Sequence, residues 1–212
     1  MESIMGHKFA EIAFTPTVKK AQERSGSRRS YARLEEGEAH HDRLGARETD
    51  FIAERDSFYM ATVSETGWPY IQHRGGPPGF VRVLDDKTIG FADFAGNRQY
   101  VSVGNLQNDD RVSLFFMDYP NQTRLKLLGR VRLAEAGELK LLERLQVPDY
   151  GACIERGMVI TVEGYDWNCP QHITPRFTAA EVRSMVAPLR DRVAELEAAL
   201  AEMSGRDETA GA

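Results

Sequence analysis

The residues best equipped for chemistry lie in one short stretch, GFADFAGNRQYVSVGNL, which spans residues 90–106. An apolar run predicts a strand, a small turn at Gly96 follows, and Asn97, Arg98 and Gln99 then open a predicted helix. Free backbone N–H groups at a helix start, together with a guanidinium and two side-chain amides, are the donors that a phosphate monoester needs. A helix cap with a surface arginine explains the same residues equally well, so both interpretations stay open on the sequence.

Two further arginines flank a loop just upstream, in the sequence QHRGGPPGFVR. Two glycines and two prolines make this loop both permissive and rigid, and Arg74 and Arg82 at its ends can converge on one anion. Arg82 shares a predicted strand face with Phe80 and Leu84, so it needs an anionic partner if that face is buried. A structural salt bridge is the alternative to a ligand.

The elements that must position these residues are mostly strands. Runs of β-branched and aromatic residues separated by turn residues predict strands at residues 57–63, 70–74, 80–84, 88–92, 111–117, 124–133 and 158–164. Helices are predicted at residues 46–55, 98–108 and 136–146. Short strands with few crossover helices favour an antiparallel barrel over a parallel sheet.

A different pattern marks the end of the chain. Apolar residues follow the 4-3 spacing of a coiled-coil seam, with Glu and Arg between them, at Val182, Val186, Leu189, Val193, Leu196, Leu200 and Met203. Pro188 lies inside this pattern and is expected to kink or divide the helix. The chain is therefore expected to comprise an N-terminal helical arm (1–48), a barrel domain (49–177), an amphipathic helix (178–204) and a disordered tail (205–212).

Composition narrows the class of protein. The 212 residues include 27 Lys and Arg against 32 Asp and Glu, and this net charge of −5 argues against a dedicated nucleic-acid binder. No apolar window approaches a membrane span, and the start lacks the pattern of a signal peptide. With two cysteines and no CxxC pair, the sequence predicts a cytoplasmic protein without a disulfide framework. Adjacent His40 and His41 have no partner at ligand spacing, so no metal is expected.

The order of these segments resembles the pyridoxamine 5′-phosphate oxidase-like family. The likeness covers roughly residues 50–135 and rests on the Arg-bearing strand, the Asp turn, the GNRQ segment and the following NDDRVSLFF. It implies an α+β fold: an antiparallel, six-stranded split β-barrel that binds FMN, with peripheral helices and the C-terminal heptad-patterned helix. In that family the phosphate of FMN is held at the positions occupied here by Arg82, Asn97, Arg98 and Gln99. Gln99 departs from a frequent Lys, which removes one positive charge from the site.

The resemblance also implies an assembly. Members of the family are homodimers with two FMN sites at the interface, and the second subunit contributes from the strand that ends here in Gly129. By this resemblance, Gln122 and Arg124 are expected to reach the flavin of the partner chain. On the residues alone, the segment RLKL is better explained as an alternating strand with a solvated basic face.

The segment WNCPQHI, after the last predicted strand, combines an indole, an amide, a thiol and an imidazole. Such a loop can lie over an isoalloxazine ring, with Trp167 against the cofactor and Cys169 or His172 as catalytic candidates. A buried free cysteine with a tryptophan packed at the strand end is the alternative. The segment lacks the Arg-x-His-x-x-Arg motif that follows a Trp in the biosynthetic oxidases, so pyridoxamine phosphate oxidation itself is not expected.

These features predict an FMN-dependent oxidoreductase for a small molecule: an oxidisable amine, a quinone-like acceptor or a reduced nicotinamide. The alternative is a non-catalytic carrier or redox sensor that holds FMN, haem or a deazaflavin in the same barrel, with the heptad helix as its output surface. A barrel without a cofactor is a third interpretation, but it leaves Arg74, Arg82, Arg98 and Arg124 without a common purpose.

Overall fold

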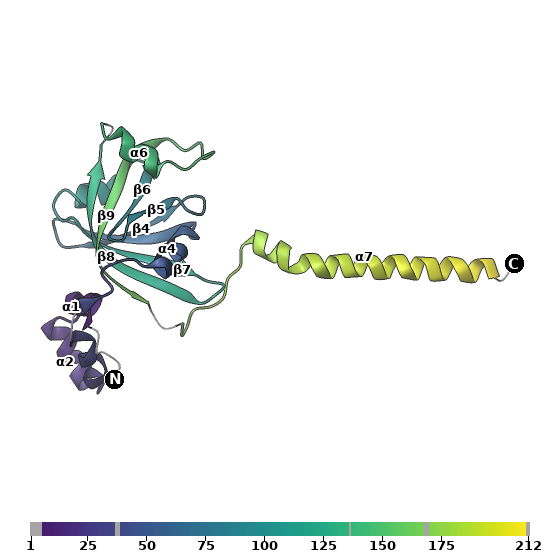
Figure 1. The fold of residues 1–212 in the computed structure, drawn as a ribbon, viewed down its shortest axis with the longest axis horizontal. Helices are drawn as coiled ribbons and strands as arrows, with labels where there is room; N and C mark the ends of the chain where they lie inside the picture. Colours follow the sequence, from purple (N-terminus) through teal and green to yellow (C-terminus); the bar gives the residue numbers. More distant parts are fainter. Residues whose placement is uncertain (1–5, 37–38, 136, 168–169, 211–212) are drawn as a thin grey trace. The chain divides into compact units, whose positions relative to one another are not determined.

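The computed structural model describes residues 6–36, 39–135, 137–167 and 170–210. The chain forms two compact units. The first consists of Met1–Asp118 and Gln122–His172 and contains the sheet, and the second consists of Tyr119–Asn121 and Ile173–Ala212 and contains the long helix α7 (Ala179–Ala210; Figure 1). Within the described residues, no helix is both long and apolar enough to cross a bilayer.

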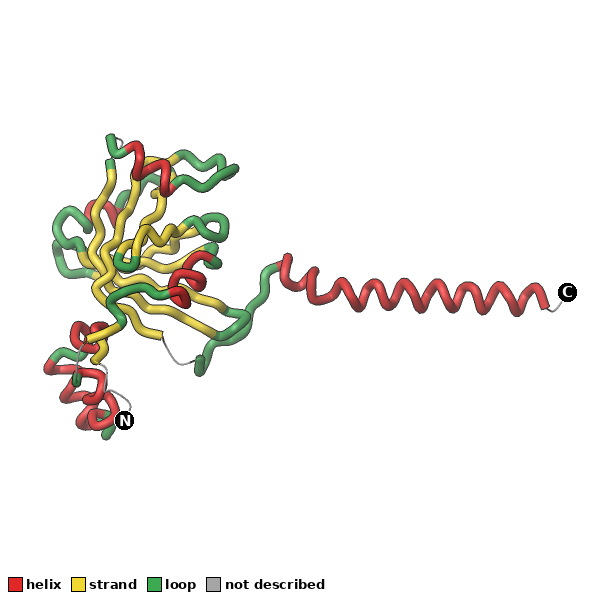
Figure 2. Tube along the Cα trace, viewed as in Figure 1, coloured by secondary structure: helices red, strands yellow, loops and turns green. Residues whose placement is uncertain are grey.

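An antiparallel sheet of seven strands is the framework of the first unit (Figure 2). Its strands are β3 (Ser57–Val63), β4 (Pro69–Gly75), β5 (Val81–Asp85), β6 (Thr88–Phe94), β7 (Arg111–Asp118), β8 (Thr123–Ala134) and β9 (Ile154–Trp167). The order β4-β3-β7-β8-β9-β6-β5 leaves β4 and β5 as edges, so the sheet is not closed. The α+β class with antiparallel strands is confirmed. The sheet has seven strands, where the resemblance implies six, and each of the seven lies at one of the strands predicted from the sequence.

Alternating apolar residues make one face of the sheet the core. In β3, Phe58 and Met60 are buried, whereas Tyr59 between them is exposed. The Phe58 ring centroid lies 5.8 Å from that of Phe80, 5.2 Å from that of Phe91 and 4.9 Å from that of Phe116. Burying each of these rings contributes roughly 1.5–3 kcal/mol, so this cluster ties β3, β6 and β7 together.

Two helices pack against the sheet. One begins after a capped glycine, and the other lies over glycines of the strands. α4 (Ala46–Ala53) begins after Gly45, whose N–H donates to Glu48 Oε2 over 3.0 Å. α6 (Leu139–Leu145) places Leu145 over two strand glycines, since a Cβ at Gly90 or Gly157 would lie 2.8 Å from this leucine. A side chain at either glycine would therefore push α6 away from β6 and β9.

The N-terminal arm belongs to the first unit and contacts β9. It comprises the parallel pair β1 (Gly6–His7) and β2 (Ala39–His40), the helices α1 (Lys8–Ala13), α2 (Pro16–Arg24) and α3 (Arg28–Ala32), and the 3-10 turn η1 (Arg33–Glu35). Glu35 forms ion pairs with Lys19 and Arg28, which tie these short elements together. A Cβ at Gly164 would lie 2.9 Å from the backbone nitrogen of Phe9, so α1 packs directly on the β9 backbone.

The helix predicted at residues 98–108 is shorter in the structure. α5 covers only Val101–Asn105, because Arg98 and Tyr100 adopt left-handed conformations with φ of 61° and 52°. Asn97, Arg98 and Gln99 therefore lie in a loop ahead of α5 and not in its first turn. A helix of this length does not provide the N-terminal anion site that the sequence suggested.

The helix of the second unit is longer than predicted. α7 runs unbroken through Pro188, so the proline does not divide it. Its backbone stays helical to Ala210, beyond the expected end at residue 204.

Candidate functional site

The loop before α5 is held in place by its own side chains. Asn97 Oδ1 accepts a hydrogen bond of 3.2 Å from the Gln99 N–H. Arg98 Nε donates to the Tyr100 hydroxyl over 3.2 Å, and this hydroxyl donates to Glu155 Oε1 over 2.9 Å. The Tyr100 hydroxyl and the Glu155 carboxylate raise the pKa of Arg98, which keeps it cationic. The loop thus presents one guanidinium group from a fixed position.

A buried carboxylate beside this loop lies between two arginines. Asp93 Oδ1 in β6 accepts a hydrogen bond of 2.5 Å from Arg74 Nη1, and Asp93 Oδ2 lies 3.7 Å from Arg156 Nη1. Asp93 and Arg156 are also cross-strand partners in the register of β6 and β9. The Arg156 guanidinium lies 5.1 Å from the centroid of the Tyr100 ring, which joins this cluster to the loop.

Both of these arginines retain donors that no protein acceptor satisfies. Arg74 Nε and Arg156 Nη1 are buried and have no hydrogen-bond partner in the described part of the chain. Such donors cost free energy when unpaired, and an anion with several oxygens would satisfy them. Three guanidinium groups and two carboxylates give the cluster a net charge of +1, which also favours an anion.

Two pockets share the side chain of Tyr100. The first encloses about 50 Å³ and is lined by Tyr70, Gln72, Arg74, Asp93, Phe94, Gly96, Asn97, Arg98, Gln99, Tyr100, Val101, Ser102, Val103 and Glu155. The second is an open groove of about 430 Å³, with Arg156 and Leu133 in its wall. Cofactor pockets usually measure about 300–1,000 Å³. The first pocket therefore suits a compact group such as a phosphate, and the second is large enough for a ring system.

Buried polar contacts fix α5 to the sheet next to the first pocket. Ser102 Oγ donates to Gln72 Oε1 over 2.8 Å, and Asn105 Nδ2 donates to Thr62 Oγ1 over 2.9 Å. Ser102, Asn105 and Thr62 are all buried, where an unmade hydrogen bond is costly. These bonds hold the end of the loop against β3 and β4.

The structure brings four of the predicted cofactor residues together. Arg74, Asn97, Arg98 and Gln99 all line the first pocket. Arg82 does not line either pocket; its Nη2 donates to the Gln146 carbonyl over 3.2 Å. The register places Arg82 opposite Gly90, on the face of β5 that α6 covers.

The two residues assigned to the partner's flavin lie elsewhere. Gln122 precedes β8 with φ of 51°, and Arg124 pairs with Met117 across β7 and β8. Arg124 alternates with the buried Leu125, so it lies on the face of the sheet away from the core. Its guanidinium lies 5.9 Å from the Phe115 ring, and its buried Nε has no hydrogen-bond partner in the described part of the chain.

Trp167 ends β9 and packs on α4. Its Nε1 donates to Glu48 Oε1 over 2.7 Å, the Arg47 guanidinium lies 4.1 Å from the ring, and the Phe51 ring centroid lies 4.8 Å away. These are the contacts of a tryptophan that closes a strand end.

The catalytic candidates after Trp167 are not part of either pocket. Cys169 lies outside the described residues. His172 is exposed, has φ of 64° and lines neither pocket. No group of three His, Cys, Asp or Glu side chains suited to a metal ion occurs within the described ranges.

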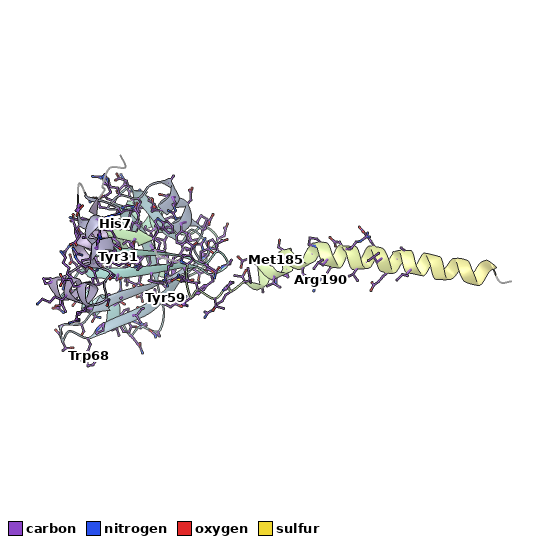
Figure 3. The ribbon with its side chains drawn as sticks, turned by 90° about the horizontal axis from the view of Figure 1, so that it is seen from below. His7, Tyr31, Tyr59, Trp68, Met185 and Arg190 are labelled. Carbon is purple, nitrogen blue, oxygen red and sulfur yellow. The ribbon has the colours of Figure 1, made fainter. Side chains whose placement is uncertain are left out.

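Large apolar side chains gather on one exposed surface of the sheet. Trp68, at the turn between β3 and β4, is 76% exposed, and Ile71 on β4 is 64% exposed. Tyr59 and Val63 lie on the same face of the sheet as Ile71, which pairs with Ala61 between them, and Tyr59 is labelled in Figure 3. We call Tyr59, Val63 and Ile71 the outer face. Exposed apolar groups on proteins often mark interaction surfaces.

Sequence reasoning missed Asp93, Tyr100, Glu155 and Arg156. A signal existed for Arg156, because it lies two residues before the buried Met158 and so shares its strand face. Asp93 similarly follows the apolar run IGFA. Nothing local marks Tyr100 or Glu155, because their hydrogen bond joins residues 55 positions apart.

Comparison with solved structures finds likenesses of low sequence identity. HupZ from Group A Streptococcus is 17% identical, with 63% of this chain and 99% of that chain covered and a TM-score of 0.48. An FMN-binding protein from Syntrophomonas wolfei is 16% identical, with 56% and 81% covered and a TM-score of 0.44. A protein from Clostridium acetobutylicum related to general stress protein 26, of the pyridoxinephosphate oxidase family, is 16% identical, with 64% and 94% covered and a TM-score of 0.43.

Comparison with the curated proteins finds no match. The family model described as pyridoxamine 5′-phosphate oxidase matches residues 45–160, which is more than half of the 212 residues. The matched region contains the arginine cluster and the loop before α5. The chain therefore belongs to the pyridoxamine 5′-phosphate oxidase family.

Proposed function

We propose that this chain is an FMN-dependent oxidoreductase for a small molecule and is not the biosynthetic pyridoxamine phosphate oxidase. The observation that carries the proposal is Arg74 Nε, a buried nitrogen with no hydrogen-bond acceptor among the described residues, in the pocket that the cationic Arg98 also lines. A phosphate monoester offers several acceptor oxygens and a negative charge to this site. The residues present therefore fit the phosphate of FMN.

When bound, FMN supplies the redox chemistry, and the protein binds, orients and shields it. Arg74 and Arg98 line the first pocket and would hold the phosphate. Asp93 fixes the Arg74 and Arg156 side chains by its contacts to them, and Arg156, in the wall of the second pocket, would add a third positive charge. Tyr100 separates this anchor from the larger pocket, whose volume of about 430 Å³ is sufficient for a flavin ring.

The proposal includes a homodimer with cofactor sites at its interface. The outer face offers the apolar surface that such an interface needs. Arg124 lies on the same side of the sheet with an unsatisfied Nε, so it is available to a ligand held by the partner.

We propose that the protein is located in the cytoplasm. Cys153 is a free and exposed thiol, and such thiols persist in a reducing compartment. The chain's acidic balance agrees with a small-molecule partner in place of a nucleic acid.

The test compares FMN with riboflavin, which lacks the phosphate. We expect Arg98→Ala to weaken FMN binding about 10- to 100-fold, as the loss of one charge-assisted hydrogen bond predicts, and to leave riboflavin binding unchanged. Quenching of flavin fluorescence measures both affinities. The matched control is Arg130→Ala, which removes an exposed arginine paired with Asp110 and Glu163.

Two outcomes would count against the assignment. Equal affinity of the wild-type protein for FMN and riboflavin would show that the chain has no site for the phosphate. A Soret band in the purified protein would show that the bound cofactor is haem and not a flavin. Oxidoreductase activity is tested separately by steady-state oxidation of reduced nicotinamides with the FMN-loaded protein. Binding without turnover would support the carrier or sensor alternative.

A further inference from the structure

We propose that α7 pairs with α7 of a second copy of this chain as a parallel, in-register, two-stranded coiled coil. The seam residues Val182, Leu189, Val193, Leu196 and Leu200 are between 46% and 66% exposed. Five large apolar side chains along one line of a helix are costly in water unless another surface covers them. This inference concerns a surface that the proposed function does not use.

The chemistry of the seam selects its occupant. With the 4-3 spacing, Val186, Val193 and Leu200 take the a positions of the heptad, and Leu189 and Leu196 take d positions. β-branched residues at a with leucine at d favour parallel, two-stranded coiled coils. An identical helix has this same pattern, so a second copy is the partner that matches it layer by layer.

Charges beside the seam support the same orientation. Arg192 occupies a g position and Glu197 occupies the next e position. In a parallel pair these residues face each other across the interface, which gives two symmetric attractive contacts. In an antiparallel pair, g residues face g residues, and the g residues Met185, Arg192 and Ala199 offer no carboxylate to Arg192.

The local geometry of α7 leaves the seam available. Met185 and Arg190 flank it and are labelled along α7 in Figure 3. Pro188 occupies a c position, outside the a and d seam, and the helix is continuous through it. Arg192 pairs with Glu195 of the same helix at 2.8 Å, with both side chains 66% exposed. Exposed pairs of this kind are weak, so this one leaves Arg192 able to pair with a partner helix.

Disulfide trapping in the full-length chain tests the pairing. In a background with Cys153→Ser and Cys169→Ser, Leu196→Cys places one thiol at a d position, where the two Cα atoms of a parallel pair are close enough for a disulfide. Ala198→Cys, at an f position on the opposite side of the helix, is the matched control. In a glutathione redox buffer we expect the first variant to form covalent dimers and the second to stay monomeric on non-reducing gels.

Either of two results would overturn the proposal. Failure of the Leu196→Cys variant to cross-link shows that the seams do not meet in register, and equal cross-linking of both variants shows random collision.

Charge reversal provides a second readout. Arg192→Glu should reduce the fraction cross-linked at equilibrium about fivefold, and adding Glu197→Arg should restore it. Cross-linking is measured without flavin, so a negative result is distinguishable from a failure of the chain to bind FMN.

Discussion

Tyr165 is buried between the arm and α4, and its environment opposes ionisation. Burial and the nearby charge of Glu48 raise the pKa of Tyr165 to about 12. The ordinary value is 10.0, so the folded protein retains this proton longer than the unfolded chain does. We expect the stability that Tyr165 contributes to be complete below pH 10 and to be lost as the pH rises towards 12.

The measurement compares wild type with Tyr165→Phe by urea denaturation between pH 9 and 11.5. The phenylalanine variant should lose less stability over this range, because it has no proton to release. Absorbance at 295 nm should show one tyrosine fewer titrating near pH 12 in the variant. Ionisation of Tyr165 near pH 10 would contradict the argument.

The stability that His7 contributes is expected to depend on pH in the opposite direction, and in the acidic range. Its ring stacks on His41 at a centroid distance of 4.1 Å, with Asp166 at 3.7 Å and Lys126 nearby. Burial, and then the charge of His41, lower the pKa of His7 below 6.5. A lowered folded-state pKa means that stability is complete above pH 6.5 and falls as the pH decreases.

The free energy of unfolding should therefore fall from pH 7 to pH 5 more steeply in wild type than in His7→Gln. His40→Gln is the matched control, since His40 is exposed on the same small sheet. Identical slopes for wild type and His7→Gln would show that His7 does not couple folding to protonation.

At the scale of elements, the backbone of α1 in the N-terminal arm lies directly against the backbone of β9. A Cβ at Gly164 would lie 2.9 Å from Phe9 N and 3.2 Å from the Lys8 carbonyl carbon. Backbone cannot swing aside as a flexible side chain can, so we expect Gly164→Ala to destabilise the protein by about 1–3 kcal/mol. Urea denaturation followed by circular dichroism measures the change.

The matched control for that substitution lies in a helix with free space. A Cβ at Gly104 in α5 would meet nothing within 4 Å, and alanine favours helix over glycine. Gly104→Ala is expected to be neutral or to stabilise by about 0.5–1 kcal/mol. Destabilisation by both variants to the same extent would mean that the close approach of α1 to β9 has no special cost.

The elements also show what the sequence could and could not predict. Strands such as Ser57–Val63 were predictable, because alternation of apolar and polar residues is a local property of a half-buried strand. The start of α5 was not, because Tyr100 bonds to Glu155, which is distant in sequence. Likewise, the resemblance implies a phosphate role for Arg82 but gives no sign of the hydrogen bond from its Nη2 to the carbonyl of Gln146, 64 positions away. Arg156 can be assigned to the site only from the pairing of β6 with β9, which places it opposite Asp93.

At the scale of the whole molecule, the hydrophobic core lies in one of the two units. The residues of the hydrophobic core cluster, from Leu44 to Tyr165, all lie in the first unit. A chain that ends at residue 178, before α7, is therefore expected to unfold at the same temperature as the full chain, within about 2 °C. Thermal denaturation by circular dichroism checks this, and a lower midpoint would show that α7 supports the fold.

This shortened chain isolates the outer face as an interface. We expect it to remain dimeric in light scattering, and Ile71→Glu to make it monomeric, because a carboxylate in an apolar interface loses its hydration without gaining a partner. Leu139→Glu is a closely matched control, since Leu139 on α6 is 66% exposed and Ile71 is 64% exposed. Loss of the dimer in both variants would mean that added charge acts without regard to position. A shortened chain that is already monomeric would assign association to α7 and leave each cofactor site to be completed within one chain.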